Sequence, residues 1–84
     1  MHHEIKIRQC FLIHILEGKK TFEVRENDRD YQVGDTIYFM PLVDDNYNVH
    51  EKDKNLPYFD ITYVHTGLGM EPGYVVLGIK PVDY

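Results

Sequence analysis

Apolar and polar positions alternate over short segments along most of this chain, which predicts a protein built mainly of β-strands. The alternation is seen at residues 3–8, 21–26 and 58–66. Residues 36–43 are strongly β-prone, and residues 74–80 form an apolar run that predicts a buried strand. A hairpin tip is expected at residues 44–46, with a short return strand at about 47–50. Residues 51–57 are charged and lack periodicity, so they predict an exposed loop. The pattern therefore predicts five or six short strands.

One segment, residues 9–17, has helical spacing instead. Its large apolar residues recur three and four positions apart, as on one face of a helix: Phe11, Leu12, Ile15 and Leu16. Gly18 follows directly, and a glycine in the left-handed conformation commonly ends a helix. One helix followed by a run of strands predicts an α+β, mainly β fold, in which the strands form a small, partly open β-barrel. A chain of 84 residues suits a single domain over residues 1–84.

Composition and charge narrow the classes of function. The single cysteine, Cys10, excludes an internal disulfide, and the longest apolar run is too short to span a membrane, so a cytoplasmic protein is expected. The net charge of -5 argues against binding to long duplex DNA. Six of the nine basic residues nevertheless lie in the first 34 positions, which leaves room for a local basic pocket suited to a nucleotide or a short single strand.

The densest group of candidate functional residues lies where the predicted helix leads into the second strand. Glu23 and Arg25 are two positions apart, so they point to the same face of an extended segment, with Lys20 just before them. Phe22 and Val24 would then face the core. A carboxylate, a guanidinium and an ammonium on one face predict a polar binding or catalytic surface. The alternative is a solvated strand face with an ordinary ion pair.

The same residues carry a resemblance to a known superfamily. The spacing Gly18-x-Lys20-x-x-Glu23-x-Arg25 resembles the signature of the ASCH domains, which are relatives of the PUA RNA-binding fold. Taken together, the sequence segments at residues 3–7, 18–25, 27–35 and 67–77 resemble the DUF3850 domains of phages and bacteria within that superfamily. The resemblance covers nearly the whole chain and implies a small PUA-like barrel.

The resemblance also implies a binding function for RNA or a nucleotide beside the barrel. Lys20 and Arg25 would then meet a phosphate or a base edge, and Glu23 would accept a hydrogen bond from a base amine. Tyr31 or Tyr74 would supply a ring for stacking. Three further residues are expected in the wall of this site: His3, Lys6 and Arg29.

Two alternatives remain open from the sequence. Some ASCH domains are similar to amidohydrolases that act on acylated cytidine, and another branch is ribonucleolytic, which implies a small hydrolase with Lys20 and Glu23 as its acid and base. Glu23, however, occupies the position at which the amidohydrolases carry a threonine nucleophile, and this departure argues against acyl-enzyme chemistry. The other alternative is a phage-encoded protein-interaction module. The histidine spacing predicts no metal site, and no cofactor is expected.

Overall fold

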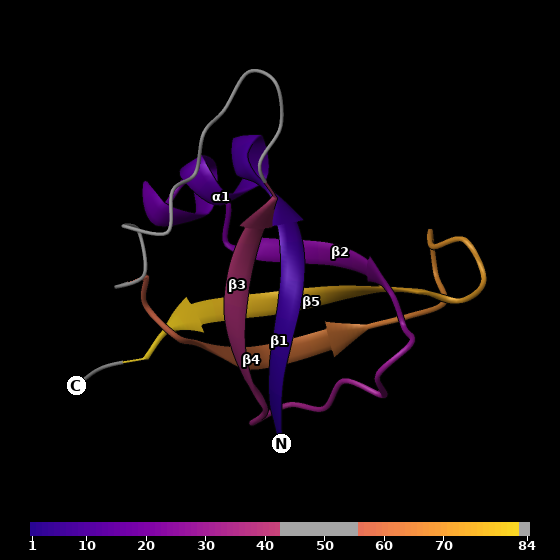
Figure 1. Cartoon of the computed structure of the whole chain (residues 1–84). Coiled ribbons are helices and arrows are strands. Elements are labelled where there is room, and N and C mark those ends of the chain that lie inside the picture. Colours follow the sequence, from indigo (N-terminus) through magenta and orange to yellow (C-terminus); the bar gives the residue numbers. More distant parts are fainter. Residues whose placement is uncertain (43–55, 83–84) are drawn as a thin grey trace.

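A computed structural model describes residues 1–42 and 56–82 of the chain. The chain begins with strand β1 (His2–Arg8) and passes directly into helix α1 (Gln9–Leu16) (Figure 1). Four strands follow within the described residues: β2 (Phe22–Glu26), β3 (Thr36–Leu42), β4 (Phe59–His65) and β5 (Tyr74–Pro81). The predicted hairpin tip and return strand at residues 44–50, and most of the loop predicted at residues 51–57, lie outside the described residues.

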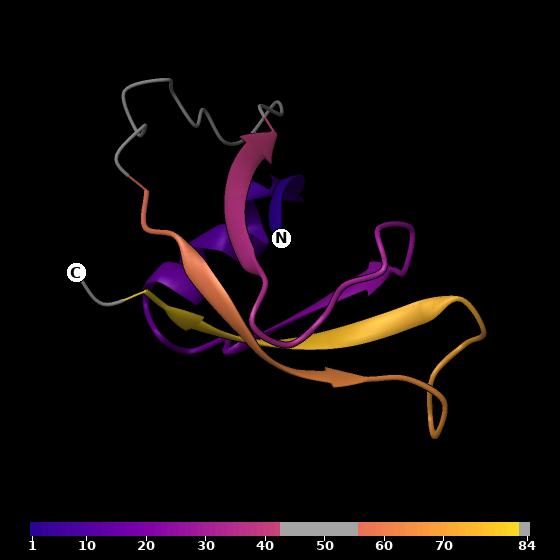
Figure 2. The same ribbon diagram turned by 90° about the horizontal axis from the view of Figure 1, so that it is seen from below.

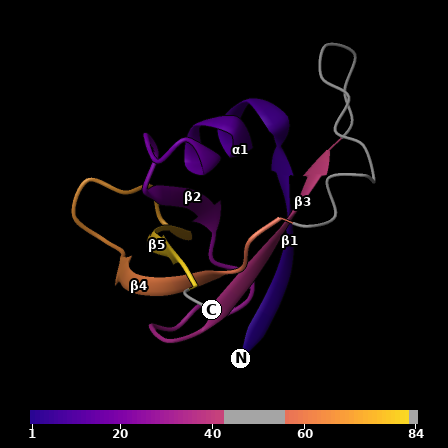
Figure 3. The same cartoon turned by 90° about the vertical axis from the view of Figure 1, so that its left-hand side faces the viewer.

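The five strands form one curled sheet in the order β1-β3-β4-β5-β2. β1 and β3 are parallel, and the other neighbours are antiparallel. Figure 1 shows β1 and β3 running across the direction of the other three strands, Figure 2 shows the same crossing for β3, and Figure 3 shows the sheet curling around an interior beside α1. This arrangement confirms the predicted mainly β, partly open barrel with one helix. It leaves β1 and β2 as the two ends of the sheet, and we call the gap between them the seam.

The core lies inside the curled sheet and is almost entirely apolar. Every strand except β2 contributes apolar side chains to it, and the buried apolar residues are Ile5, Ile7, Leu12, Ile15, Tyr31, Ile37, Phe39, Phe59, Ile61, Val75, Leu77 and Ile79. The alternating strand pattern of the sequence therefore places the inward faces of β1, β3 and β5 correctly.

The helix buries only part of its predicted stripe. Leu12 and Ile15 are 3% and 4% exposed, whereas Phe11 and Leu16 are exposed at 43% and 46%. The helix is a little over two turns long and packs against β1 and β3, so only residues on one narrow line of its surface reach the core. Gly18 adopts a φ of 78° after its end, as the sequence predicts.

The orientation predicted for β2 is wrong. Phe22 and Val24 are exposed at 43% and 47%, while Glu23 is only 4% exposed and Arg25 is half-buried. A strand at the end of a sheet has no neighbour on one side, so long polar side chains can close the barrel there while apolar residues remain at the surface. The polar face of β2 therefore points toward the interior.

An irregularity in β4 also changes which side chains face inward. The pairing of β4 with β5 shifts between Ile61 and Tyr63, so Tyr63 leaves the face that regular alternation along residues 58–66 would give it beside Phe59 and Ile61. Tyr63 lies opposite Gly78 and is 65% exposed. A Cβ at Gly78 would lie 3.0 Å from Thr62 Oγ1 and 3.3 Å from Tyr63 Cβ, so the absence of a side chain there lets the two strands approach.

None of the helices among the described residues has both the length and the apolar composition needed to cross a membrane.

Candidate functional site

The Glu23 carboxylate lies between two cations. Lys20 Nζ donates a hydrogen bond to Glu23 Oε1 at 3.1 Å, and Arg25 Nη1 donates to Glu23 Oε2 at 3.1 Å. The side chain of Glu23 is 5% exposed, against 18% for Lys20 and 25% for Arg25. A carboxylate this buried needs charged partners, and here each of its oxygens has one. Glu23 is therefore not part of a solvated strand face.

Lys20 is fixed by further contacts. Its ammonium donates to the carbonyl oxygen of Phe22 at 2.8 Å and lies 4.5 Å from the centre of the Phe22 ring. The Phe11 ring of α1 lies 5.4 Å from the same nitrogen. A cation close to aromatic rings is stabilised by their negative faces. The two exposed phenylalanines thus hold Lys20 against Glu23, which accounts for apolar residues on the outer surface of this strand.

Two arginines join the ends of the sheet across the seam. Arg25 Nη1 donates to the carbonyl oxygen of Lys6 at 2.8 Å, and Arg29 Nη1 donates to the carbonyl oxygen of Glu4 at 3.0 Å. Glu4 and Lys6 are two apart on β1, so their carbonyl groups point to the same side of that strand. β1 is one end of the sheet, so on its edge away from β3 these carbonyls have no strand partner among the described residues. Side-chain donors therefore close the barrel where backbone pairing stops.

A pocket of about 330 Å³ opens at the seam. It is lined by the end of β1, by β2, and by residues from α1, β3 and β5: Lys6, Ile7, Arg8, Phe11, Glu23, Val24, Arg25, Glu26, Leu42 and Tyr74. We call it the seam pocket. Three basic residues line it, and Glu23 is already engaged by Lys20 and Arg25. Its rim carries the rings of Phe11 and Tyr74, which are 43% and 40% exposed.

His3 is placed away from the seam pocket, in a separate buried group around Asp35. His3 Nε2 lies 2.8 Å from Asp35 Oδ2, and the same oxygen accepts a hydrogen bond from the backbone N–H of Gln32 at 3.1 Å. The terminal amine of Met1 donates to Asp35 Oδ1 at 3.0 Å. These bonds, that of His3 first, lower the pKa of Asp35 to about 2. They tie β1 to the turn before β3, and they give His3 a structural role.

Tyr31 is buried and cannot stack on a ligand at the surface. It is 3% exposed, and its ring meets the His3 ring edge-on at a centroid distance of 4.8 Å. Burial raises the pKa of its hydroxyl, and the nearby positive charge of Arg25 opposes the rise. The hydroxyl makes no hydrogen bond of standard geometry within the described part of the chain. Of the two tyrosines considered for stacking, Tyr74 alone is accessible.

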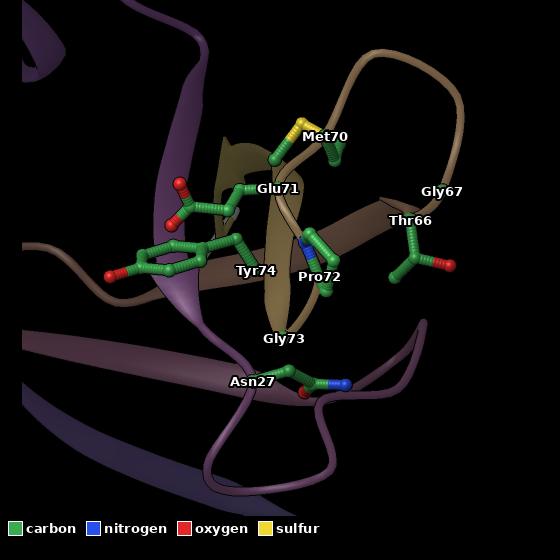
Figure 4. A pocket seen from close by; sticks show the side chains of 8 residues that line it. All are labelled: Asn27, Thr66, Gly67, Met70, Glu71, Pro72, Gly73 and Tyr74. Carbon is green, nitrogen blue, oxygen red and sulfur yellow. The ribbon is translucent and has the colours of Figure 1, made fainter.

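Tyr74 connects the seam pocket to two further hollows beneath the glycine-rich segment between β4 and β5. One has a volume of about 480 Å³ and is lined by Asn27, Thr66, Gly67, Met70, Glu71, Pro72, Gly73 and Tyr74 (Figure 4). The other, of about 200 Å³, is lined by Val24, Gly69, Met70, Glu71 and Tyr74, and we call it the loop pocket. Val24 and Tyr74 line both the loop pocket and the seam pocket, so these two adjoin.

The structure thus brings together some of the residues predicted for a ligand site and separates others. Glu23, Arg25, Lys6 and Tyr74 line the seam pocket, and Lys20 contacts two of its lining residues, Glu23 and Phe11. Arg29 closes the seam farther along β1, and His3 belongs to the Asp35 group.

The sequence prediction missed other residues of these pockets. Arg8 lies two positions after Lys6 and so on the same face of β1, and this spacing alone would have placed Arg8 in the site beside Lys6. Phe11 was instead assigned to the core stripe of the helix. Leu42 and Glu71 join their pockets through contacts between segments distant in the sequence, and no local pattern marks them. Among the described residues, no group of three or more histidine, cysteine, aspartate or glutamate side chains is arranged to hold a metal ion.

Fold and site together define a small, partly open β-barrel protein with a polar pocket at its seam. A family model described as a domain of unknown function, DUF3850, matches residues 2–79, and the chain belongs to this family. Over 35 residues, which are 42% of this chain, it is 46% identical to the "Uncharacterized 12.9 kDa protein in GpA 3'region" of Escherichia phage P2. The matched segment covers 32% of the length of that phage protein.

Proposed function

We propose that this protein binds single-stranded RNA or a nucleotide at the seam pocket. The carrying observation is that Lys6, Arg8 and Arg25 line one pocket whose rim also presents exposed aromatic rings. Basic groups beside accessible rings are the combination by which proteins hold a phosphate backbone and stack its bases. An acidic molecule with one local basic pocket suits a short single strand better than a long duplex.

Preorganisation of Arg25 supports this proposal. Its guanidinium is fixed by Glu23 on one side and by the Lys6 carbonyl on the other. A guanidinium has five N–H donors, so donors remain for an incoming phosphate oxygen. Holding the group in place before binding reduces the entropy that a flexible arginine would lose. Lys6 and Arg8 are exposed on the same face of β1 and add positive charge at the entrance.

The arrangement of Glu23 favours binding over the hydrolase alternative. A general base needs an oxygen within reach of the proton that it removes. Both Glu23 oxygens already accept charged hydrogen bonds, one from Lys20 and one from Arg25. The carboxylate is therefore arranged to orient the two cations.

The test measures binding of fluorescein-labelled short oligouridine by fluorescence anisotropy. Lys6→Ala and Arg8→Ala should each weaken binding about tenfold, because each removes a charge-assisted contact. Each should also make the fall of the logarithm of the binding constant with the logarithm of the salt concentration less steep by about 0.7, the value for one phosphate contact on a single strand. Lys6→Ala keeps the backbone carbonyl that Arg25 contacts, so the barrel closure is retained.

Lys80→Ala is the matched control, because Lys80 is exposed at the far end of β5 and lines none of the pockets described above. It should bind oligouridine as the wild type does. Unchanged affinity in both Lys6→Ala and Arg8→Ala, or an equal loss in Lys80→Ala, would contradict the proposed site.

A further inference from the structure

Tyr74 and Glu71 form a second polar feature next to the seam pocket. Tyr74 is the residue that lines all three of the pockets described above, and Glu71 shares two of them with it. Tyr74 lies opposite Glu26 in the pairing of β5 with β2, one position from Arg25. Successive side chains of a strand point to opposite faces, so Tyr74 shares the outer face of the sheet with Glu26 while Arg25 points inward. Arg25 and Tyr74 nevertheless both line the seam pocket, so a strand whose phosphate lies at Arg25 would have its next base close to the Tyr74 ring.

The backbone fixes Glu71 relative to that ring. The N–H of Tyr74 donates to the carbonyl oxygen of Glu71 at 3.1 Å, which closes the turn that contains Pro72 and Gly73. The carbonyl oxygen of Gly73 accepts from Asn27 N–H at 2.8 Å, and this bond attaches the turn to the end of β2. Figure 4 shows the Glu71 carboxylate and the Tyr74 ring on the same side of the turn, with the Asn27 side chain apart from them. The loop pocket thus combines one aromatic face with one carboxylate.

The chemistry of an aromatic ring beside a carboxylate distinguishes the nucleobases. The ring stacks on any base, but an ionised carboxylate only accepts hydrogen bonds, and it has two oxygens side by side. Guanine alone among the four RNA bases presents two adjacent donors on its Watson–Crick edge, the N1–H and the N2 amine. Cytosine and adenine each place an acceptor nitrogen beside their amine, and uracil has its N3–H between two carbonyl groups. Those acceptors would face the carboxylate and repel it.

We propose that the loop pocket recognises guanine, with its base on Tyr74 and its N1–H and N2 amine donating to the Glu71 carboxylate. This inference rests on the proposed binding of single-stranded RNA at the seam pocket and adds base specificity to it. The preferred ligand is then a short single strand in which a guanosine lies beside the phosphate held by Arg25, Lys6 and Arg8.

The experiment compares labelled oligouridines that differ only in one central base. This base is guanine, hypoxanthine (the base of inosine), adenine, cytosine or uracil. Hypoxanthine keeps N1–H and lacks the N2 amine, so it isolates one of the two proposed bonds. The wild type should bind the guanine strand about tenfold more tightly than the hypoxanthine strand. Glu71→Gln, which keeps the size and loses one acceptor, should bind these two strands within about twofold of each other.

Glu26→Gln is the matched control. Glu26 is an exposed carboxylate that faces Tyr74 in the strand pairing and lines the seam pocket. Removing its charge should tighten binding of all five strands similarly and leave the preference for guanine over hypoxanthine unchanged. A preference abolished equally by Glu26→Gln would mean that general charge, and not Glu71, sets it, and would overturn the inference.

The outcomes separate this inference from the proposed function. Equal affinity of the wild type for all five strands, with binding still dependent on Lys6 and Arg8, would overturn guanine recognition and leave the seam pocket as the binding site. No binding of any strand would overturn both. Tyr74→Leu should weaken all five strands, because the stacking surface is lost; a variant that binds them as the wild type does would exclude Tyr74 as the platform.

Discussion

Arg25 donates through Nη1 to the carbonyl oxygen of Lys6 at 2.8 Å while the same nitrogen lies 3.1 Å from Glu23 Oε2. One side chain therefore joins the two ends of the sheet and neutralises a buried carboxylate. The stability of the barrel and the charge of its pocket depend on the same residue.

Arg25→Ala is expected to lower the free energy of unfolding by about 2 to 3 kcal/mol, because it leaves the buried Glu23 with Lys20 as its cation and opens the seam. Urea denaturation followed by circular dichroism measures this loss. Arg29→Ala is the control, since it removes a single exposed bond to the Glu4 carbonyl and should cost under about 1 kcal/mol. Equal losses in the two variants would show that Glu23 adds nothing to the role of Arg25.

Leu12→Ala and Ile15→Ala should each cost about 2 to 5 kcal/mol, because both side chains are buried against the sheet and their removal leaves cavities. Leu16→Ala, at an exposed position on the same helix, should cost under about 1 kcal/mol. Chemical denaturation of the three variants tests the packing of α1. A loss below about 1 kcal/mol at both buried positions would mean that the helix does not contact the core as described.

Protonation of Asp35 should make the protein less stable in acid. Its pKa is about 2 in the folded protein, below the ordinary value of 3.8, so the unfolded chain takes up the proton first as the pH falls. The stabilisation is complete above about pH 4 and is lost as the pH falls toward 2. Urea midpoints measured across this range should fall less steeply in Asp35→Asn and in His3→Ala. A wild-type slope in both variants would contradict the role of this group.

Glu23→Gln separates a binding protein from an enzyme. It keeps the size and one acceptor oxygen but removes the charge, so RNA or nucleotide affinity should stay within roughly tenfold of the wild type. An enzyme using Glu23 as proton acceptor would instead lose about a hundredfold or more in rate with little change in substrate binding. Acylated cytidines and short RNAs, followed by mass spectrometry, are the substrates to examine. Turnover by the wild type that Glu23→Gln abolishes would overturn the binding proposal in favour of a hydrolase.

The sequence was sufficient for the class of fold and for most strand positions. Ile5, Ile37 and Val75 lie on faces that alternate regularly, and burial of apolar side chains decides their direction. The parallel pairing of β1 with β3 and the placement of β2 beside β5 join segments distant in the chain, and no local pattern encodes them.

The inward direction of Glu23 could not be read from its neighbours. The rule that apolar residues face inward assigns Phe22 and Val24 to the core, and it fails because β2 ends the sheet and its polar residues find charged partners across the seam. The shift in pairing that turns Tyr63 outward is a second such case, since a bulge changes the period of a strand without a local signal. Both errors arise where strand pairing is interrupted.

The arginine bonds across the seam have unequal sequence requirements on their two sides. The acceptors are the main-chain carbonyls of Glu4 and Lys6, which every amino acid supplies, whereas the donors are particular side chains. Substitutions at Glu4 or Lys6 can therefore change the charge beside the seam without removing the two hydrogen bonds that close it. The requirement for a particular side chain in these two bonds therefore falls on Arg25 and Arg29, and the side chains of Glu4 and Lys6 take no part in closing the barrel.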